Sequence, residues 1–175
     1  NTLSSQRIRT ERLLIMQALA EEVGETCNLA APSRYGMVYL DRVETHWPLR
    51  IQLPVGTQVP FHCTASGKMY LSSLRTEKLQ RLLGALQLEK RTPQTLTDIE
   101  RLFDELGAIS TRGYSTDNEE FMEGMCAVAV PIKDSEGRLL TTLSVHAPDQ
   151  RRSLTTLLDT LEPLNTAANK LAELN

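Results

Sequence analysis

The apolar residues near the start of the chain recur at helical spacing and then change to the alternation typical of strands. The helical spacing covers residues 7–23, and Gly24 is suited to end the helix. Strand patterns bounded by Gly, Pro and polar residues follow in three segments: residues 26–31, 37–43 and 49–53. The pattern predicts one helix followed by an antiparallel meander of three short strands.

The middle of the chain carries signals for helix starts. Thr64 and Thr76 are each placed to cap a short helix with a side-chain oxygen. Thr97 begins a capping box in which Glu100 reaches back toward the cap, and an apolar stripe continues from there to Gly113. The pattern predicts three helices in this part of the chain.

The clearest strand signals follow this helical region. Strand patterns at residues 127–133 and 139–145 flank a polar turn, and residues 114–116 form a weaker strand. Leucines at helical spacing then indicate a last helix, which Pro163 should kink or divide. Helices attached to one antiparallel sheet define an α+β fold rather than a doubly wound one.

Composition and charge narrow the class of protein. The chain has 175 residues, 41% of them apolar, which is enough for one domain with its own core. Its net charge is −3 and its cations are interspersed with acids, so this stretch alone is not expected to bind DNA. The 3 cysteines are widely spaced and favour neither a disulfide framework nor a zinc ribbon. Without a long apolar run or a signal peptide, we expect a cytoplasmic protein with no membrane partner.

The strand pattern at residues 139–146 offers the first candidate chemistry. Successive side chains alternate between faces, so Thr142, Ser144 and His146 share one face. Paired with an apolar neighbour, this strand would present hydrogen-bonding groups to a pocket. The alternative is a polar strand face turned to solvent, which antiparallel sheets commonly have.

Two further segments carry polar groups. Ala65, Ser66 and Gly67 open a helix, where free backbone N–H groups favour a carboxylate or another anion. An ordinary capped helix start is the alternative. Asp117 belongs to a polar run, residues 114–120, which is either a solvated loop or a segment that turns one acid inward.

Catalytic and metal-binding interpretations have weaker support. Cys126, His146 and Asp117 are the residue types of a nucleophile, a base and an orienting acid, but no local motif joins them. His62 and Cys63, with Cys126 and His146, have the chemistry of a metal site without the close spacing that would specify one. We therefore predict neither an enzyme nor a metal or cofactor site.

Several motifs resemble, in order and spacing, those of the IclR family of bacterial transcriptional regulators. They include the strand VYLDRVE and the helix start PFHCTASGK. Together they cover nearly the whole chain, from about residue 10 to residue 174: residues 38–44, 53–56, 60–68, 95–98, 112–121, 124, 128–132 and 143–145.

The resemblance implies a GAF-like effector-binding domain, in which a curved antiparallel sheet of about six strands has helices on one face and a ligand pocket on the other. Members of the family bind operator DNA through an N-terminal winged helix-turn-helix and respond to small carboxylates or aromatic acids as homodimers or homotetramers. The sequence begins at Asn1, without Met and without such a segment. We therefore expect residues 1–24 to be a linker helix and residues 25–175 the effector-binding domain, with activation and repression both open.

Position by position, the resemblance places nine residues around the effector: Ile51, Val59, Ala65, Ser66, Asp117, Met125, Ala127, Ser144 and His146. Many members of the family have Arg–Cys where this chain has Cys126 and Ala127, and a small residue where it has His146. Ala127 should enlarge one wall of the pocket, and His146 adds a donor that is either neutral or cationic. A GAF-like enzyme with a pocket cysteine and an oligomerisation module with a filled interior are the alternatives.

Overall fold

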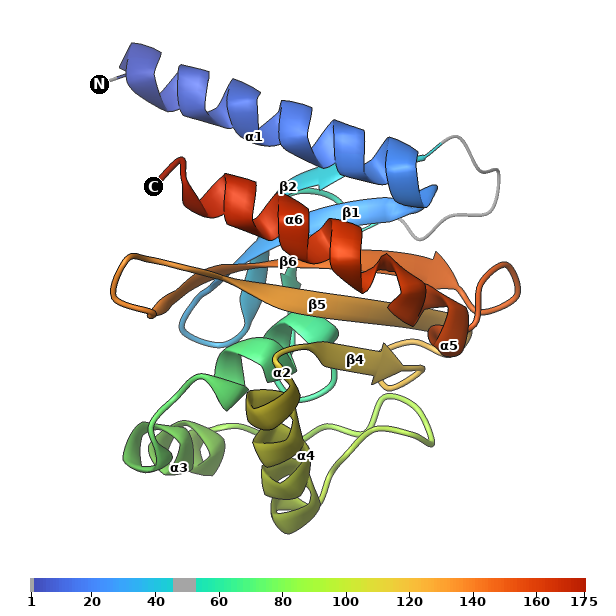
Figure 1. The fold of residues 1–175 in the computed structure, drawn as a ribbon. Coiled ribbons are helices and arrows are strands. Elements are labelled where there is room, and N and C mark those ends of the chain that lie inside the picture. The colour runs from blue at the N-terminus through green and yellow to red at the C-terminus, as the bar shows by residue number, and fades with distance from the viewer. Residues whose placement is uncertain (1, 46–52) are drawn as a thin grey trace.

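The computed structural model describes residues 2–45 and 53–175, which form one sheet with helices on both of its faces (Figure 1). A short 3₁₀ helix, η1, precedes the last α-helix. The elements in chain order are α1 (Thr2–Val23), β1 (Thr26–Pro32), β2 (Met37–Val43), β3 (Gln58–Val59), α2 (Ala65–Ser72), α3 (Thr76–Ala85), α4 (Ile99–Arg112), β4 (Ser115–Asn118), β5 (Met125–Lys133), β6 (Leu139–Pro148), α5 (Leu154–Leu157), η1 (Leu158–Thr160) and α6 (Leu161–Ala172).

The sheet is antiparallel throughout and has six strands in the order β3-β2-β1-β6-β5-β4. The hairpin of β5 and β6 turns at Gly137, whose φ of 81° is unstrained only for glycine. Strand β6 then pairs with β1, so the start and the end of the chain meet in the centre of the sheet. The predicted six-stranded α+β fold is confirmed.

Helices cover both faces of the sheet. Helices α1 and α6 pack side by side on one face, and α2 lies on the other face and packs against α4 (Figure 1). Each face has its own apolar cluster, because successive strand residues point to opposite sides. We call the side covered by α2, which carries Tyr39 and Ala127, the α2 face. The expected pocket side therefore carries a helical cover of its own.

Helix α1 is tied to the sheet by a buried carboxylate. Asp41 lies on β2 and accepts hydrogen bonds from Arg9 Nε at 3.1 Å and from Arg12 Nε at 3.1 Å. A fully buried carboxylate is tolerated only with such charged partners. The helix ends where predicted, at Gly24, which has a φ of 74°.

The predicted helix starts are right in one case and shifted by one residue in two. Thr64 caps α2 as expected, because its side chain accepts the Gly67 N–H at 3.0 Å. Thr97 is not the cap of α4; Asp98 accepts the Glu100 N–H at 2.9 Å instead. Thr76 is the first residue of α3 rather than its cap. Adjacent Thr and Asp are both good caps, so spacing alone does not choose between them.

The last helical region is divided, as Pro163 predicts. The division lies at η1, and Pro163 falls in the first turn of α6, where its missing N–H breaks no intrahelical bond. The strand expected at residues 49–53 lies mostly outside the described residues, as does Ile51. None of the helices within the described ranges is long and apolar enough to cross a membrane.

Candidate functional site

The register of four strands brings polar residues together on the α2 face. Asp117 on β4 lies opposite Ala127 on β5, and Ala127 lies opposite His146 on β6. One step along the strands, Ser144 lies opposite Asn28 on β1. All of these side chains are buried, so the alternative of a strand face turned to solvent is wrong for β6.

The first turn of α2 lies over this face, and the chain is shaped locally to hold it there. Helix α2 packs against β4, β5, β6 and β1. The Thr64 hydroxyl accepts the Gly67 N–H and donates to Pro60 O at 2.6 Å, which folds the preceding loop back under the helix. A Cβ on Gly67 would lie 2.4 Å from the Phe61 carbonyl oxygen. Only glycine therefore fits at this position. The first backbone hydrogen bond of α2 runs from Lys68 N–H to Thr64 O, so the N–H groups of Ala65 and Ser66 have no acceptor within the helix.

The α2 face carries an unusual number of buried polar atoms without a partner. Buried polar groups in proteins are nearly always hydrogen-bonded, and exceptions call for an explanation. Within the described part of the chain, the following side-chain atoms of this face and of α2 have no hydrogen-bond partner: Asn28 Nδ2, Tyr39 Oη, Ser66 Oγ, Ser115 Oγ, Asp117 Oδ2, Thr142 Oγ1 and His146 Nδ1. Their concentration in one layer defines the candidate site.

His146 is held as a neutral ring. Its Nε2 lies 2.9 Å from Ser144 Oγ, and its ring meets the Tyr39 ring edge-on with centroids 6.2 Å apart. Burial, with a smaller contribution from the positive charge of Arg42, lowers the pKa of His146 to about 3. Of the two states left open by the sequence, the geometry favours the uncharged imidazole.

Asp117 is the second titratable group on this face. Burial raises its pKa to about 7, and the charge of Glu120 adds to the effect. Its Oδ1 accepts the Glu120 N–H at 2.7 Å, while Glu120 Oε1 binds the ammonium of Lys68 at 2.8 Å. Lys68 is fully buried in α2 and also binds Glu105 of α4 at 3.1 Å. This chain of contacts fixes Asp117 relative to α2.

Three further predicted residues lie in the apolar surround of the candidate site. Val59, Met125 and Ala127 are buried in the cluster between the sheet and α2. Sequence analysis missed Asn28 and Tyr39. Each lies in an otherwise apolar stretch of its strand, and a polar residue in such a stretch could have indicated a buried polar group. Their partners on β6 could not be known without the pairing of β1 with β6.

The structure separates the residues of the alternative interpretations. Cys126 lies on the opposite face of the sheet from His146 and packs in the apolar cluster beneath α6. Its thiol lies 3.7 Å from Asp149 Oδ1, and burial raises its pKa to about 12. A nucleophile, a base and Asp117 are therefore not assembled. Among the described residues, no group of three or more His, Cys, Asp or Glu is arranged to hold a metal ion.

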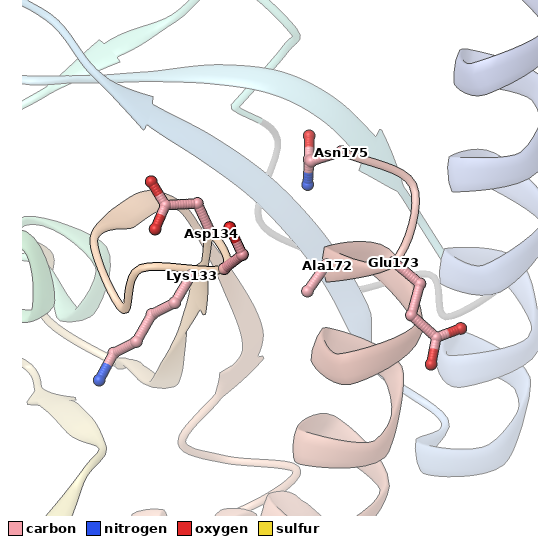
Figure 2. A pocket seen from close by; sticks show the side chains of 6 residues that line it. Lys133, Asp134, Ala172, Glu173 and Asn175 are labelled. Carbon is pink, nitrogen blue, oxygen red and sulfur yellow. The ribbon is translucent and has the colours of Figure 1, made fainter.

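A surface depression of about 390 Å³ lies elsewhere, between the β5–β6 turn and the end of α6 (Figure 2). Lys133 and Asp134 line one side, and Ala172, Glu173 and Asn175 line the other. Asp134 is already bound to Arg138 at 2.9 Å. The depression contains none of the predicted site residues.

Comparison with known families and proteins gives one consistent result. The family described as bacterial transcriptional regulator IclR C-terminal matches residues 1–173. The chain is 39% identical over 173 residues to a probable transcriptional regulator, SauR, of Cupriavidus necator, covering 99% of this chain and 69% of SauR. It is 35% identical to the HTH-type transcriptional regulator BhcR of Paracoccus denitrificans, covering 90% of this chain and 57% of BhcR.

A solved structure shares the fold. The inducer-binding domain of an Acinetobacter transcription factor, PobR, was determined as a double mutant in complex with 3-hydroxybenzoic acid. It matches with a TM-score of 0.85 at 26% sequence identity, over 92% of this chain and 95% of that domain.

Proposed function

The chain belongs to the IclR family of bacterial transcriptional regulators as their effector-binding domain, and on this premise we propose that it binds a small acid between α2 and the α2 face. The partly polar chamber proposed here is lined by the predicted residues Val59, Ala65, Ser66, Asp117, Met125, Ala127, Ser144 and His146. Ile51 is kept in the proposal from the resemblance alone.

The observation that carries this proposal is the layer of unpaired polar atoms. Ser66 Oγ, Asp117 Oδ2 and His146 Nδ1 come from a helix and two different strands and are all at least nine-tenths buried. Each such atom costs roughly 1–3 kcal/mol if nothing satisfies it. A polar ligand would satisfy such a cluster. Ligand sites are typically apolar with a few convergent polar groups, which fix the orientation of the ligand.

The chemistry of α2 favours an acid. The backbone N–H groups of Ala65 and Ser66 belong to the first helical turn, where the helix dipole stabilises negative charge. The ligand in the related PobR domain is an aromatic acid, which supports the same class here. A neutral His146 still supplies a hydrogen bond, and Asp117, with a pKa of about 7, can bind such a ligand in its protonated form.

The regulatory step proposed is linkage between effector and operator. A ligand that binds one arrangement of a homodimer or homotetramer better than another shifts operator affinity by that difference. Operator DNA would be bound by an N-terminal winged helix-turn-helix outside residues 1–175, with residues 1–24 as the linker helix and residues 25–175 as the effector-binding domain. Both an activator and a repressor are compatible with this linkage.

Calorimetric titration with a panel of small aliphatic and aromatic acids tests the proposal. Ser66→Pro removes a first-turn N–H and the hydroxyl, and His146→Ala removes the imidazole. We expect each variant to weaken acid binding by about tenfold or more, the effect of losing one to two hydrogen bonds to a charged ligand.

Helix α3 offers the matched control. Glu77 is the second residue of α3, as Ser66 is of α2, and it is exposed. Glu77→Pro should therefore leave acid binding unchanged. Wild-type affinity in both Ser66→Pro and His146→Ala would exclude the site.

A further inference from the structure

We propose that the site has a second polar end, formed by Asn28, Tyr39 and His146, and that the effector carries a second acceptor group and is therefore a short diacid. This inference rests on the proposed function and narrows its ligand class. The first end comprises the start of α2 and Asp117; the second lies across the sheet on β1, β2 and β6.

The residues of the second end form one connected cluster. The Tyr39 ring contacts the His146 ring, and His146 binds the Ser144 hydroxyl at 2.9 Å. Ser144 faces Asn28 across β6 and β1, and its hydroxyl lies 3.5 Å from the Asn28 carbonyl oxygen. Asn28 Oδ1 accepts from Arg42 Nη1 at 3.1 Å. Strands that are distant in sequence therefore bring these side chains into one connected cluster.

Three atoms of this cluster are left to bind something else. Tyr39 Oη, Asn28 Nδ2 and His146 Nδ1 have no hydrogen-bond partner within residues 2–45 and 53–175, and all three side chains are at least nine-tenths buried. Burial raises the pKa of the Tyr39 hydroxyl, so this group stays protonated and keeps a hydrogen to donate.

The free groups of the second end are hydrogen-bond donors. Because Asn28 Oδ1 is used by Arg42, the amide NH₂ is the part that remains. A tyrosine hydroxyl donates, and a neutral His146 donates from Nδ1 in the tautomer whose Nε2 accepts the Ser144 O–H. Arg42 is itself paired with Glu44 at 3.0 Å and adds positive potential beside these donors. Donors next to a guanidinium favour a carboxylate or a similar acidic oxygen group.

The two ends together specify the ligand. A single acidic group bound at Ala65, Ser66 and Asp117 leaves Asn28 and Tyr39 unpaired even when it also accepts a hydrogen bond from His146. A second acidic group on the same molecule removes that cost. A monoacid of the same length would place an apolar carbon against buried donors, which is penalised strongly in binding.

Tyr39→Phe is the sharpest test, because it deletes one oxygen that makes no hydrogen bond to the described protein and keeps the ring that packs on His146. The fold should therefore be unaffected. Tyr35→Phe is the matched control, since Tyr35 is 62% exposed. The probes are pairs of equal carbon number: propionate with malonate, butyrate with succinate, and valerate with glutarate.

By calorimetry, we expect wild type to bind at least one diacid about tenfold or more tightly than its paired monoacid. Tyr39→Phe should weaken that diacid about five- to tenfold and change the monoacid less than about twofold, and Tyr35→Phe should change neither. Equal affinity of wild type for the members of every pair, or an unchanged diacid affinity in Tyr39→Phe, would overturn the inference. If only acids outside these pairs bind, the inference fails and the proposed function stands; if no acid binds, both fail.

Discussion

His146 and Ser144 lie two residues apart on one face of β6, and the His146 Nε2 is 2.9 Å from the Ser144 hydroxyl oxygen. This contact fixes the ring inside the protein, where burial disfavours its charged form. The imidazole thus offers the proposed ligand a neutral hydrogen-bonding group rather than a positive charge.

We predict that His146 makes the protein less stable as the pH falls below 6.5. The pKa of about 3 in the folded state lies below the unfolded value of 6.5, so the unfolded chain binds a proton that the folded chain does not. The effect is absent above pH 6.5 and grows to about 2 kcal/mol at pH 5. Denaturant unfolding at pH 7.5 and pH 5 should show that His146→Gln loses this part of the pH dependence. An NMR titration in which the His146 ring protonates near pH 6.5 would contradict the prediction.

The opposite sign is expected for Asp117. Its pKa of about 7 in the folded state lies above its usual value of 3.8, so its contribution is favourable at low pH and is lost as the pH rises from about 4 to 7. Asp117→Asn keeps the acceptor for the Glu120 N–H and removes the ionisation. The variant should be more stable than wild type at pH 7.5, by up to about 4 kcal/mol relative to their difference at pH 4. The same unfolding measurements check this, and parallel pH profiles of the two proteins would refute it.

Lys68 should be far more important for stability than an exposed cation. It is fully buried between Glu120 and Glu105, so Lys68→Met removes the ammonium that both carboxylates share. Glu105 keeps only a longer contact with Arg112, at 3.9 Å. Loss of about 3–5 kcal/mol of unfolding free energy is expected. Arg138→Met, which removes an exposed ion pair with Asp134, should change stability little. Urea unfolding compares the two variants, and similar losses in both would contradict the assignment.

Gly67 and Gly107 make a second matched pair. A Cβ at Gly67 would meet the Phe61 backbone, whereas one at Gly107 in α4 meets nothing within 4 Å. Gly67→Ala should destabilise the protein by about 1–3 kcal/mol and weaken acid binding, because the first turn of α2 must shift. Gly107→Ala should stabilise it by about 0.5–1 kcal/mol, the usual gain from replacing a helical glycine. Thermal unfolding with calorimetric titration separates the two outcomes.

The elements of the fold were largely predictable from local patterns, and the candidate site was predictable only in part. Local strand patterns identified β1, β2, β5 and β6, but such patterns do not reveal that β6 pairs with β1. Asn28 and Tyr39 thus became part of the site only through long-range pairing. The predicted cap of α4 was wrong because Thr97 and the adjacent Asp98 can both cap a helix, and the structure uses Asp98. Ser144 and His146 could be predicted to share a strand face, because periodicity defines that face.

Strand β2 has different partners on its two sides. Toward α1 it presents Asp41, held by Arg9 and Arg12, and toward α2 it presents Tyr39 and Arg42. A ligand that binds Tyr39 and displaces this strand would also displace Asp41 and, through it, Arg9 and Arg12 of α1. We therefore expect ligand binding on the α2 face to change the tilt of α1 on the opposite face of the sheet.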